Sequence, residues 1–219
     1  LSSIDERWQS SLAPQENIVV GVKGQVTPFK WLSLTANAAT SVFNTDKRMD
    51  NVPVKTDFDK VFDVKYSSLM RFAGDVSANI ILPGVNANVS YRMVQPDYTS
   101  LGTYYMTNNY HSLGITLGTT LFNKLTLSGT FSGQEDNLSN EQMFTTCGYI
   151  YGANATMRLG NHLNITAGYN GYLQTQRDGT VKVNDSTKIH RMMQSFSLTP
   201  TVAFDTELLG HSASLSLNY

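Results

Sequence analysis

The chain has 219 residues, a formal net charge of −1 and a charged fraction of only 15%. A chain of this size forms one sandwich or barrel domain or two small domains, and because nothing in it resembles an inter-domain linker, we expect a single domain over residues 1–219. The low charge, without a basic patch or stripe, argues against nucleic acid as a partner.

Apolar and small polar residues alternate along most of the chain, which is the period of a β-strand. The pattern predicts about ten strands of roughly nine to twelve residues. In chain order, residues 18–27 and 32–43 form the first predicted hairpin, and residues 69–81 and 85–94 form the second. Three more hairpins are closed by short turns, which we expect at residues 122–124, 159–162 and 205–210.

Longer polar connections join these hairpins, at residues 44–66, 95–110, 135–143 and 175–191. Residues 44–66 hold ten charged side chains, whereas residues 111–134 hold only Lys124. Short turns on one rim and long loops on the other are typical of bacterial outer-membrane barrels, in which the long loops are extracellular.

The polar face of the predicted strands differs from that of an ordinary soluble sheet. Between Val85 and Met93 the odd-numbered residues are apolar, and Asn86, Asn88, Ser90 and Arg92 occupy the even positions. Elsewhere, too, Asn, Ser, Thr and Gly stand where a solvent-exposed sheet normally has Lys and Glu. No apolar run approaches the roughly 18 residues of a membrane helix, so a membrane-spanning form of this chain must be a closed barrel. The sequence therefore predicts an all-β fold, an antiparallel up-and-down transmembrane β-barrel with a polar interior.

Two further features refine this prediction. Pro200 falls within a predicted strand, where it removes a donor from the hydrogen-bond ladder, so we expect a bulge or a local gap there. Aromatic residues gather near the strand ends, as in the girdles that mark the two membrane interfaces. The expected girdle residues are Phe29, Trp31, Phe122 and Phe204 near the turns and Phe43, Tyr91, Tyr149, Tyr151 and Tyr172 near the loops.

The direction of the strands predicts a chain that is truncated at both ends. If the short turns are periplasmic, the strand from Ile18 begins at the extracellular rim, and the strand that ends at Tyr219 finishes there. Complete outer-membrane barrels normally have an even strand count with both ends periplasmic. The ten strands are therefore expected to belong to a barrel of at least about twelve.

Two of the long loops carry a family resemblance. A Tyr-Arg strand end at Tyr91 runs into the loop sequence Pro-Asp-Tyr-Thr-Ser-Leu-Gly at residues 96–102, and Gln-Glu-Asp-Asn-Leu follows at residues 134–138. Over residues 85–175 the chain resembles large, mostly uncharacterised outer-membrane β-barrel proteins of Bacteroidota. The resemblance implies a Gram-negative outer membrane as the location and a barrel that works beside other envelope proteins. It implies no enzymatic activity and no defined ligand.

Five charged residues fall on the polar face of the predicted strands: Lys23, Arg71, Asp75, Arg92 and Arg158. Inside a barrel they would form a selectivity or ligand patch. Equally, they would form a salt-bridged plug that fills a narrow interior.

A second group of candidate residues is the tyrosines of the loop 95–110: Tyr98, Tyr104, Tyr105 and Tyr110. Tyrosines in a loop stack on sugars or hold a partner. The alternative, which we favour, is that they pack against the rim.

The sequence offers little support for catalysis. The four histidines, at positions 111, 162, 190 and 211, lack the spacing of metal ligands. Ser195 lies near His190, but no nucleophile elbow and no orienting acid accompany them. We therefore expect no enzyme activity, no cofactor and no metal.

The function expected from these features is that of a transport, secretion or envelope-assembly component in a bacterial outer membrane. Its partners would be the lipid bilayer, or detergent after extraction, and other outer-membrane proteins or lipoproteins. An alternative is a surface β-sandwich that binds carbohydrate or a protein partner through its aromatic loops. The barrel and the sandwich differ in what covers the apolar face of the strands. A barrel exposes this face to lipid, whereas a sandwich buries it against a second sheet.

Overall fold

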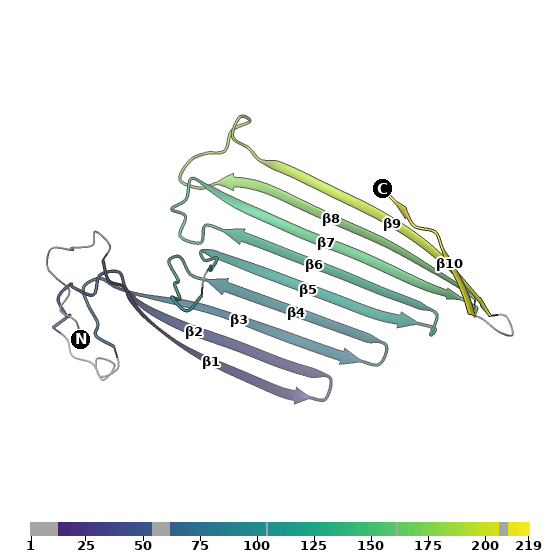
Figure 1. Cartoon of the computed structure of the whole chain (residues 1–219), viewed down its shortest axis with the longest axis horizontal. Coiled ribbons are helices and arrows are strands. Elements are labelled where there is room, and N and C mark those ends of the chain that lie inside the picture. The colour runs from purple at the N-terminus through teal and green to yellow at the C-terminus, as the bar shows by residue number, and fades with distance from the viewer. Residues whose placement is uncertain (1–12, 54–61, 104, 161, 206–209) are drawn as a thin grey trace.

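The computed structural model describes residues 13–53, 62–103, 105–160, 162–205 and 210–219. Within them the chain forms one antiparallel sheet whose strands follow one another in sequence order (Figure 1). The strands are β1 (Glu16–Phe29), β2 (Leu32–Asn44), β3 (Ser68–Leu82), β4 (Val85–Val94), β5 (Tyr110–Leu121), β6 (Leu125–Asp136), β7 (Phe144–Leu159), β8 (Leu163–Asp178), β9 (His190–Asp205), β10 (Gly210–Ser214) and β11 (Leu217–Asn218). No helix in this part of the chain is long and apolar enough to span a membrane.

These strands confirm the predicted all-β, antiparallel up-and-down class. Several are longer than expected, and β7, β8 and β9 each have 16 residues. β8 and β9 extend further toward the rim of the long loops than predicted, so the loop between them covers residues 179–189 instead of 175–191. The last predicted strand, residues 211–219, is divided into β10 and β11, and both pair with β9.

The described short turns lie at one rim of the sheet and the described long loops at the other, as predicted (Figure 1). The turn between β3 and β4 contains only Pro83 and Gly84, and Gly84 has a positive φ of 75°. A type II turn requires a positive φ at its second central residue and often has Pro at the first. Phe122 and Asn123, between β5 and β6, also have positive φ values. The turn between β9 and β10, at residues 206–209, lies outside the described residues.

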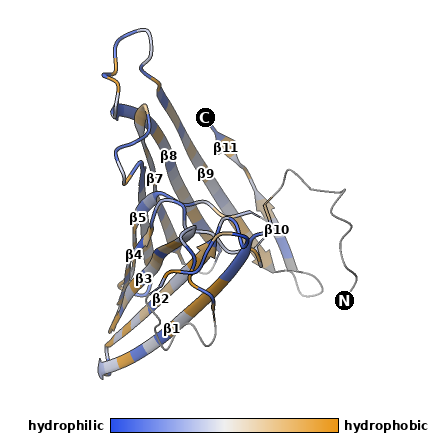
Figure 2. Ribbon diagram, turned by 90° about the vertical axis from the view of Figure 1, so that its left-hand side faces the viewer, coloured by the Kyte–Doolittle hydropathy of each residue, from blue (hydrophilic) through white to orange (hydrophobic). Residues whose placement is uncertain are grey.

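Apart from one shift near the turn between β1 and β2, at residues 26–29, the cross-strand register of the described strands is continuous, so the two faces of the strands join into two faces of the whole sheet. Apolar Val22, for example, pairs with Ala38, and Val89 pairs with Ile115 and Ala78. Polar Asn88 pairs in the same way with Asn79 and Thr116. Figure 2 shows hydrophilic and hydrophobic residues alternating along the strands of a curved, twisted sheet.

The apolar face is uncovered over most of its area. Val22 is 70% exposed, Leu117 is 52% exposed and Phe196 is 48% exposed, although each lies in the middle of a paired strand. The buried hydrophobic residues of the described chain are few, and they do not form a core beneath the sheet: Val42, Phe62, Val94, Tyr98 and Cys147. A soluble domain buries such a face, because apolar surface in water costs roughly 25 cal/mol per Å².

Aromatic side chains lie on the apolar face of β7 and β8. Tyr149 covers Gly133 on the neighbouring strand, and Tyr151 covers Gly171. Tyr151 also packs against Tyr169, with ring centroids 6.0 Å apart. For two of the expected girdle residues the prediction is wrong, because the register places Phe43 and Tyr172 on the polar face.

The sheet does not close on itself within the described residues. β1 pairs only with β2, and β10 and β11 pair only with β9, which leaves an open edge at each end. A closed ring of these ten strands is therefore not formed. Closure into a barrel by further strands stays a prediction.

Pro200 interrupts the ladder in the way expected of a local gap, without a bulge. The Leu215 amide donates to the Pro200 carbonyl oxygen at 3.2 Å, but the proline nitrogen has no hydrogen to return the bond. Opposite Pro200 the neighbouring strand is interrupted, between Ser214 at the end of β10 and Leu217 at the start of β11. Both β10 and β11 pair with β9 in the same register. On the other side of Pro200, pairing with Ile165 of β8 continues without a shift.

We predict that Pro200→Val closes this gap. Valine restores the missing donor and suits a strand, so the amides of residues 215–217 should exchange with deuterium more slowly in the variant. The matched control is Thr199→Val, which changes a neighbouring side chain of β9 but adds no backbone donor. Equal exchange rates in Pro200→Val and the unmodified protein would show that the gap has another cause.

Candidate functional site

The charged residues of the polar face form a cross-strand row through β1, β2, β3 and β4. Lys23 is the register partner of Asn37, Asn37 that of Asp75, and Asp75 that of Arg92. Asp75 accepts a hydrogen bond from the Asn37 amide at 2.7 Å, and its other carboxylate oxygen lies 3.7 Å from the Arg92 guanidinium. Because direct cross-strand neighbours on one face lie close together, the four side chains form one polar row, which we call the charged row.

A row of small residues lies next to the charged row, one step closer to the loop rim. Gly21, Ala39 and Ala73 are successive cross-strand partners on the polar face, and Val94 and Tyr110 continue the row into β4 and β5. Side chains of this size leave space above the sheet. The sequence had given these positions no functional meaning.

The loop between β4 and β5 crosses the polar face to reach β1. The Asn17 amide nitrogen of β1 donates to the Thr99 carbonyl oxygen at 3.2 Å, and the Leu101 amide donates to the Asn17 side-chain oxygen at 3.3 Å. The Ser41 hydroxyl of β2 donates to the same Thr99 carbonyl at 2.5 Å. Ser41 is almost completely buried, with an exposed fraction of 1%. The loop is thus anchored on two strands that lie far from it in the sequence.

A second anchor holds the start of the same loop. The Arg71 guanidinium of β3 donates to the Pro96 carbonyl oxygen at 3.0 Å and lies 3.6 Å from the Asp97 carboxylate. Gln95 adds a contact to the neighbouring residue of β3, since its side-chain oxygen accepts the Phe72 amide at 2.8 Å. Arg71 therefore has a structural partner in the loop.

The loop tyrosines differ in their surroundings. Tyr98 is packed beneath the loop and only 3% exposed, and this burial raises the pKa of its phenol. Tyr105 is 80% exposed, and Tyr110 is half-buried at the start of β5. Packing against the rim is thus correct for Tyr98, while Tyr105 is free to contact a ligand. Tyr104 lies outside the described residues.

An open hollow of about 630 Å³ lies between the loop and the sheet. The row of small residues and the charged row form its floor. Its polar boundary includes Lys23, Asn37, Asp75 and Arg92, and Tyr105, Met106 and Thr107 of the loop form the opposite wall. A concave site with a few convergent polar groups is the usual form of a small-molecule site. The hollow is therefore the candidate binding site of the polar face.

Four of the five predicted charged residues gather around this region, and Arg158 does not. Arg158 lies on the polar face at the opposite rim, where it pairs with Asn164 and its backbone amide donates to the Lys124 carbonyl oxygen at 2.8 Å. The structure adds Asn17, Asn37 and Ser41 to the site. Alternation placed all three on the polar face, but the contacts of Asn17 to a loop more than 80 residues away in sequence have no local signal.

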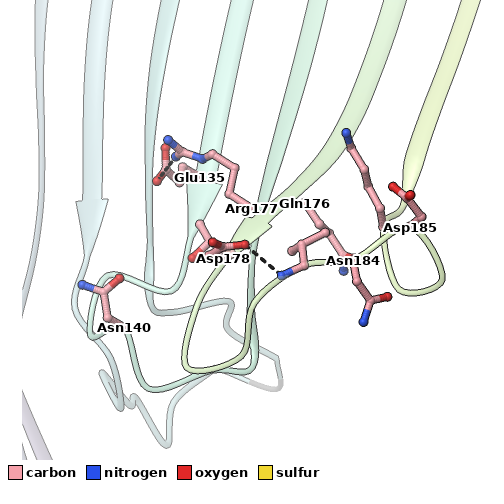
Figure 3. A pocket seen from close by; sticks show the side chains of 10 residues that line it. Glu135, Asn140, Gln176, Arg177, Asp178, Asn184 and Asp185 are labelled. Carbon is pink, nitrogen blue, oxygen red and sulfur yellow. Dashed lines mark hydrogen bonds and ion pairs between the residues drawn. The ribbon is translucent and has the colours of Figure 1, made fainter.

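A second hollow, of about 620 Å³, lies at the loop rim around the ends of β6 to β8 (Figure 3). Arg177 of β8 forms an ion pair with Glu135 of β6, and its Nε donates to the sulfur of the buried Cys147 at 3.2 Å. Asp178 accepts the Val183 backbone amide at 2.8 Å, which holds the loop 179–189 beside it. Arg177 and Glu135 are bound to each other, and Asp178 is bound to the loop. These side chains therefore anchor the loop 179–189.

Within the described residues, neither hollow holds a cluster of metal ligands. Over the described ranges, no three His, Cys, Asp or Glu residues come together as metal ligands. The histidines lie apart: the His111 ring lies 6.0 Å from Tyr91, the His211 ring packs on Phe204 at 5.2 Å, and the His162 ring nitrogen lies 2.9 Å from the Ala203 carbonyl oxygen. Comparison with known proteins finds no family model and no curated protein that matches the chain.

We predict that Asn17→Ala loosens the loop 95–109. The variant removes three donor contacts and one acceptor contact, and it leaves buried groups without partners, which costs about 1–3 kcal/mol. Chymotrypsin cleavage at the exposed Tyr105 should become roughly tenfold faster, since 1.4 kcal/mol corresponds to a factor of ten in the open population.

The control for this experiment is Asn79→Ala. Asn79 lies on the same face in β3 and makes no side-chain hydrogen bond with any residue of the described part, so cleavage should stay at the original rate. Equal cleavage of the two variants would contradict the anchoring role of Asn17.

Proposed function

We propose that this chain is part of an integral β-barrel of a bacterial outer membrane, with its apolar face against lipid and its polar face lining the interior. The observation that carries the proposal is the uncovered apolar face of a long, regular meander. A lipid bilayer covers such a face, and the charge-poor polar face of Asn, Ser, Thr and Gly suits a barrel interior.

The two open edges support closure by further strands. In lipid, each backbone group without a partner costs several kcal/mol, so a membrane-spanning sheet must be closed. We propose that the outer sides of β1 and of β10 pair with further strands in a barrel of at least about twelve. The arrangement of short turns and long loops favours the orientation in which the loops are extracellular.

The role of such a barrel is transport, secretion or envelope assembly, without catalysis of its own. The hollow on the polar face supports a role in handling a solute, because it would face the lumen. The resemblance to envelope barrels of Bacteroidota supports work beside other outer-membrane proteins or lipoproteins.

The alternative, a β-sandwich that binds carbohydrate or a protein, requires a second sheet to cover the apolar face. Every described strand belongs to one sheet, which weighs against this alternative. The exposed Tyr105 is the observation in its favour.

A pair of arginine substitutions on adjacent residues of β5 tests the lipid contact. Leu117→Arg puts a charge on the apolar face near mid-strand and should destabilise the protein in lipid vesicles by about 2–4 kcal/mol. Thr116→Arg puts the same charge on the polar face and should cost far less. Chemical unfolding in vesicles measures both; the proposal fails if the two variants are equally stable, or if the unmodified protein is folded and monodisperse without detergent.

A pair of lysine substitutions tests the orientation. The variant Lys188→Cys places a cysteine in the loop 179–189, and the variant Lys124→Cys places one in the turn between β5 and β6. In intact cells an impermeant thiol reagent should label the first and spare the second, and the native Cys147 is buried and should stay unlabelled. Labelling at Lys124→Cys alone would reverse the proposed topology.

A further inference from the structure

The hollow beneath the loop 95–109 has an excess of positive charge. Its charged boundary comprises two cations, Lys23 and Arg92, and one carboxylate, Asp75. Arg71 and Asp97 nearby compensate each other through their ion pair. The second hollow, at the rim, has the opposite balance, since Glu135, Asp178 and Asp185 outnumber Arg177 and Lys188.

Both cations of the hollow retain capacity to bind a ligand. Within the described part of the chain, Lys23 makes no ion pair or hydrogen bond, and its side chain is exposed. Arg92 has a single long contact to Asp75 at 3.7 Å, and its side chain is 58% exposed. A guanidinium has five N–H donors, so most of those of Arg92 are available.

The opposite wall of the hollow offers aromatic and polar contacts. Tyr105 presents an exposed ring, Tyr110 lies at the edge of the small-residue row, and Thr107 adds a hydroxyl. Tyrosine combines an apolar ring face with a hydroxyl at its tip, which suits a ligand that has both an apolar face and hydroxyl groups. Asn37 places an amide between Lys23 and Asp75, although its nitrogen already donates to Asp75.

We propose that this hollow is a binding site for an acidic sugar. The Lys23 ammonium binds the carboxylate, and the Arg92 guanidinium, three strands away in the same row, adds to the positive charge of the site. The tyrosines contact the sugar ring, and the Asn37 oxygen and Thr107 hydroxyl bind hydroxyl groups. Charge-assisted hydrogen bonds of this kind are about twice as strong as neutral ones, so they set the preference for an anion. The inference deepens the proposed function, on which it rests, because only in a closed barrel does this site face the lumen.

The fixed loop gives the site its shape. Contacts of Asn17, Ser41 and Arg71 hold residues 96–99 of the loop against β1, β2 and β3. The Asn108 side chain donates to the Tyr98 carbonyl oxygen at 3.2 Å, so the loop is also held on the other side of Tyr105 before a ligand arrives. Preorganisation of this kind lowers the entropy cost of binding. In the proposed barrel the loop would also narrow the lumen at the rim of the long loops.

Calorimetric titration of the folded, full-length protein in detergent tests the site, with glucuronate as the probe and glucose as its neutral counterpart. Glucuronate should bind at least about tenfold more tightly than glucose, which corresponds to one retained charge-assisted contact. Lys23→Gln should weaken glucuronate binding about tenfold and leave glucose binding unchanged.

The control variant is Arg158→Gln, which removes a cation of the same face at the opposite rim and should leave both affinities unchanged. Equal affinity for the two sugars, no glucuronate binding by folded protein, or an equal loss in Arg158→Gln and Lys23→Gln would overturn the inference. Flotation of the same preparation with lipid vesicles distinguishes a failure of the sugar site from a failure of the proposed membrane location. Protein that floats without binding glucuronate refutes the site alone, whereas protein that binds glucuronate without floating refutes the membrane location alone.

Discussion

The alternation of side chains, kept in register across the strands except for one shift at the end of β1, determines the form of the whole sheet. Because a one-residue slip would move every apolar side chain to the other face, the pairing from β1 to β9 must hold its register along the strands, and it does so up to the shift between Val26 and Phe29. The result is one polar face and one apolar face that the rest of the described chain leaves uncovered over most of its area. Stability then comes mainly from the hydrogen-bond ladders and from whatever medium meets the apolar face, since a hydrophobic core of the usual kind is lacking in these residues.

The same register builds the candidate site. It aligns Lys23, Asn37, Asp75 and Arg92 in one row and places small residues beside them, so that a loop can lie across the sheet without a clash. The loop is fixed by side chains from β1, β2 and β3, which also makes the site depend on strands distant in sequence. In many proteins the binding residues likewise lie on loops that a rigid scaffold positions.

Much of this fold could be predicted from local sequence, and much of the site could not. The period of two identified the strands, their faces and the turns, because it reflects side-chain direction within a single strand. Pro200 identified a gap for a similarly local reason, the missing donor. The course of the loop 95–109 depends on contacts such as Asn17 to Thr99, which join strands through tertiary structure and leave no periodic signal. Closure of the sheet likewise depends on pairing partners for β1 and β10 that the sequence pattern does not specify.

The proposed function requires that one face of the sheet contacts lipid and that the other contacts water. Nitroxide labels placed singly at residues 113 to 118 of β5, in the full-length protein reconstituted into vesicles, test it most directly. The account predicts that accessibility to dissolved oxygen is high at Leu113, Ile115 and Leu117, while accessibility to a water-soluble nickel chelate is high at Gly114, Thr116 and Gly118. Nickel accessibility on both faces, or low oxygen accessibility at the three apolar positions, would contradict it.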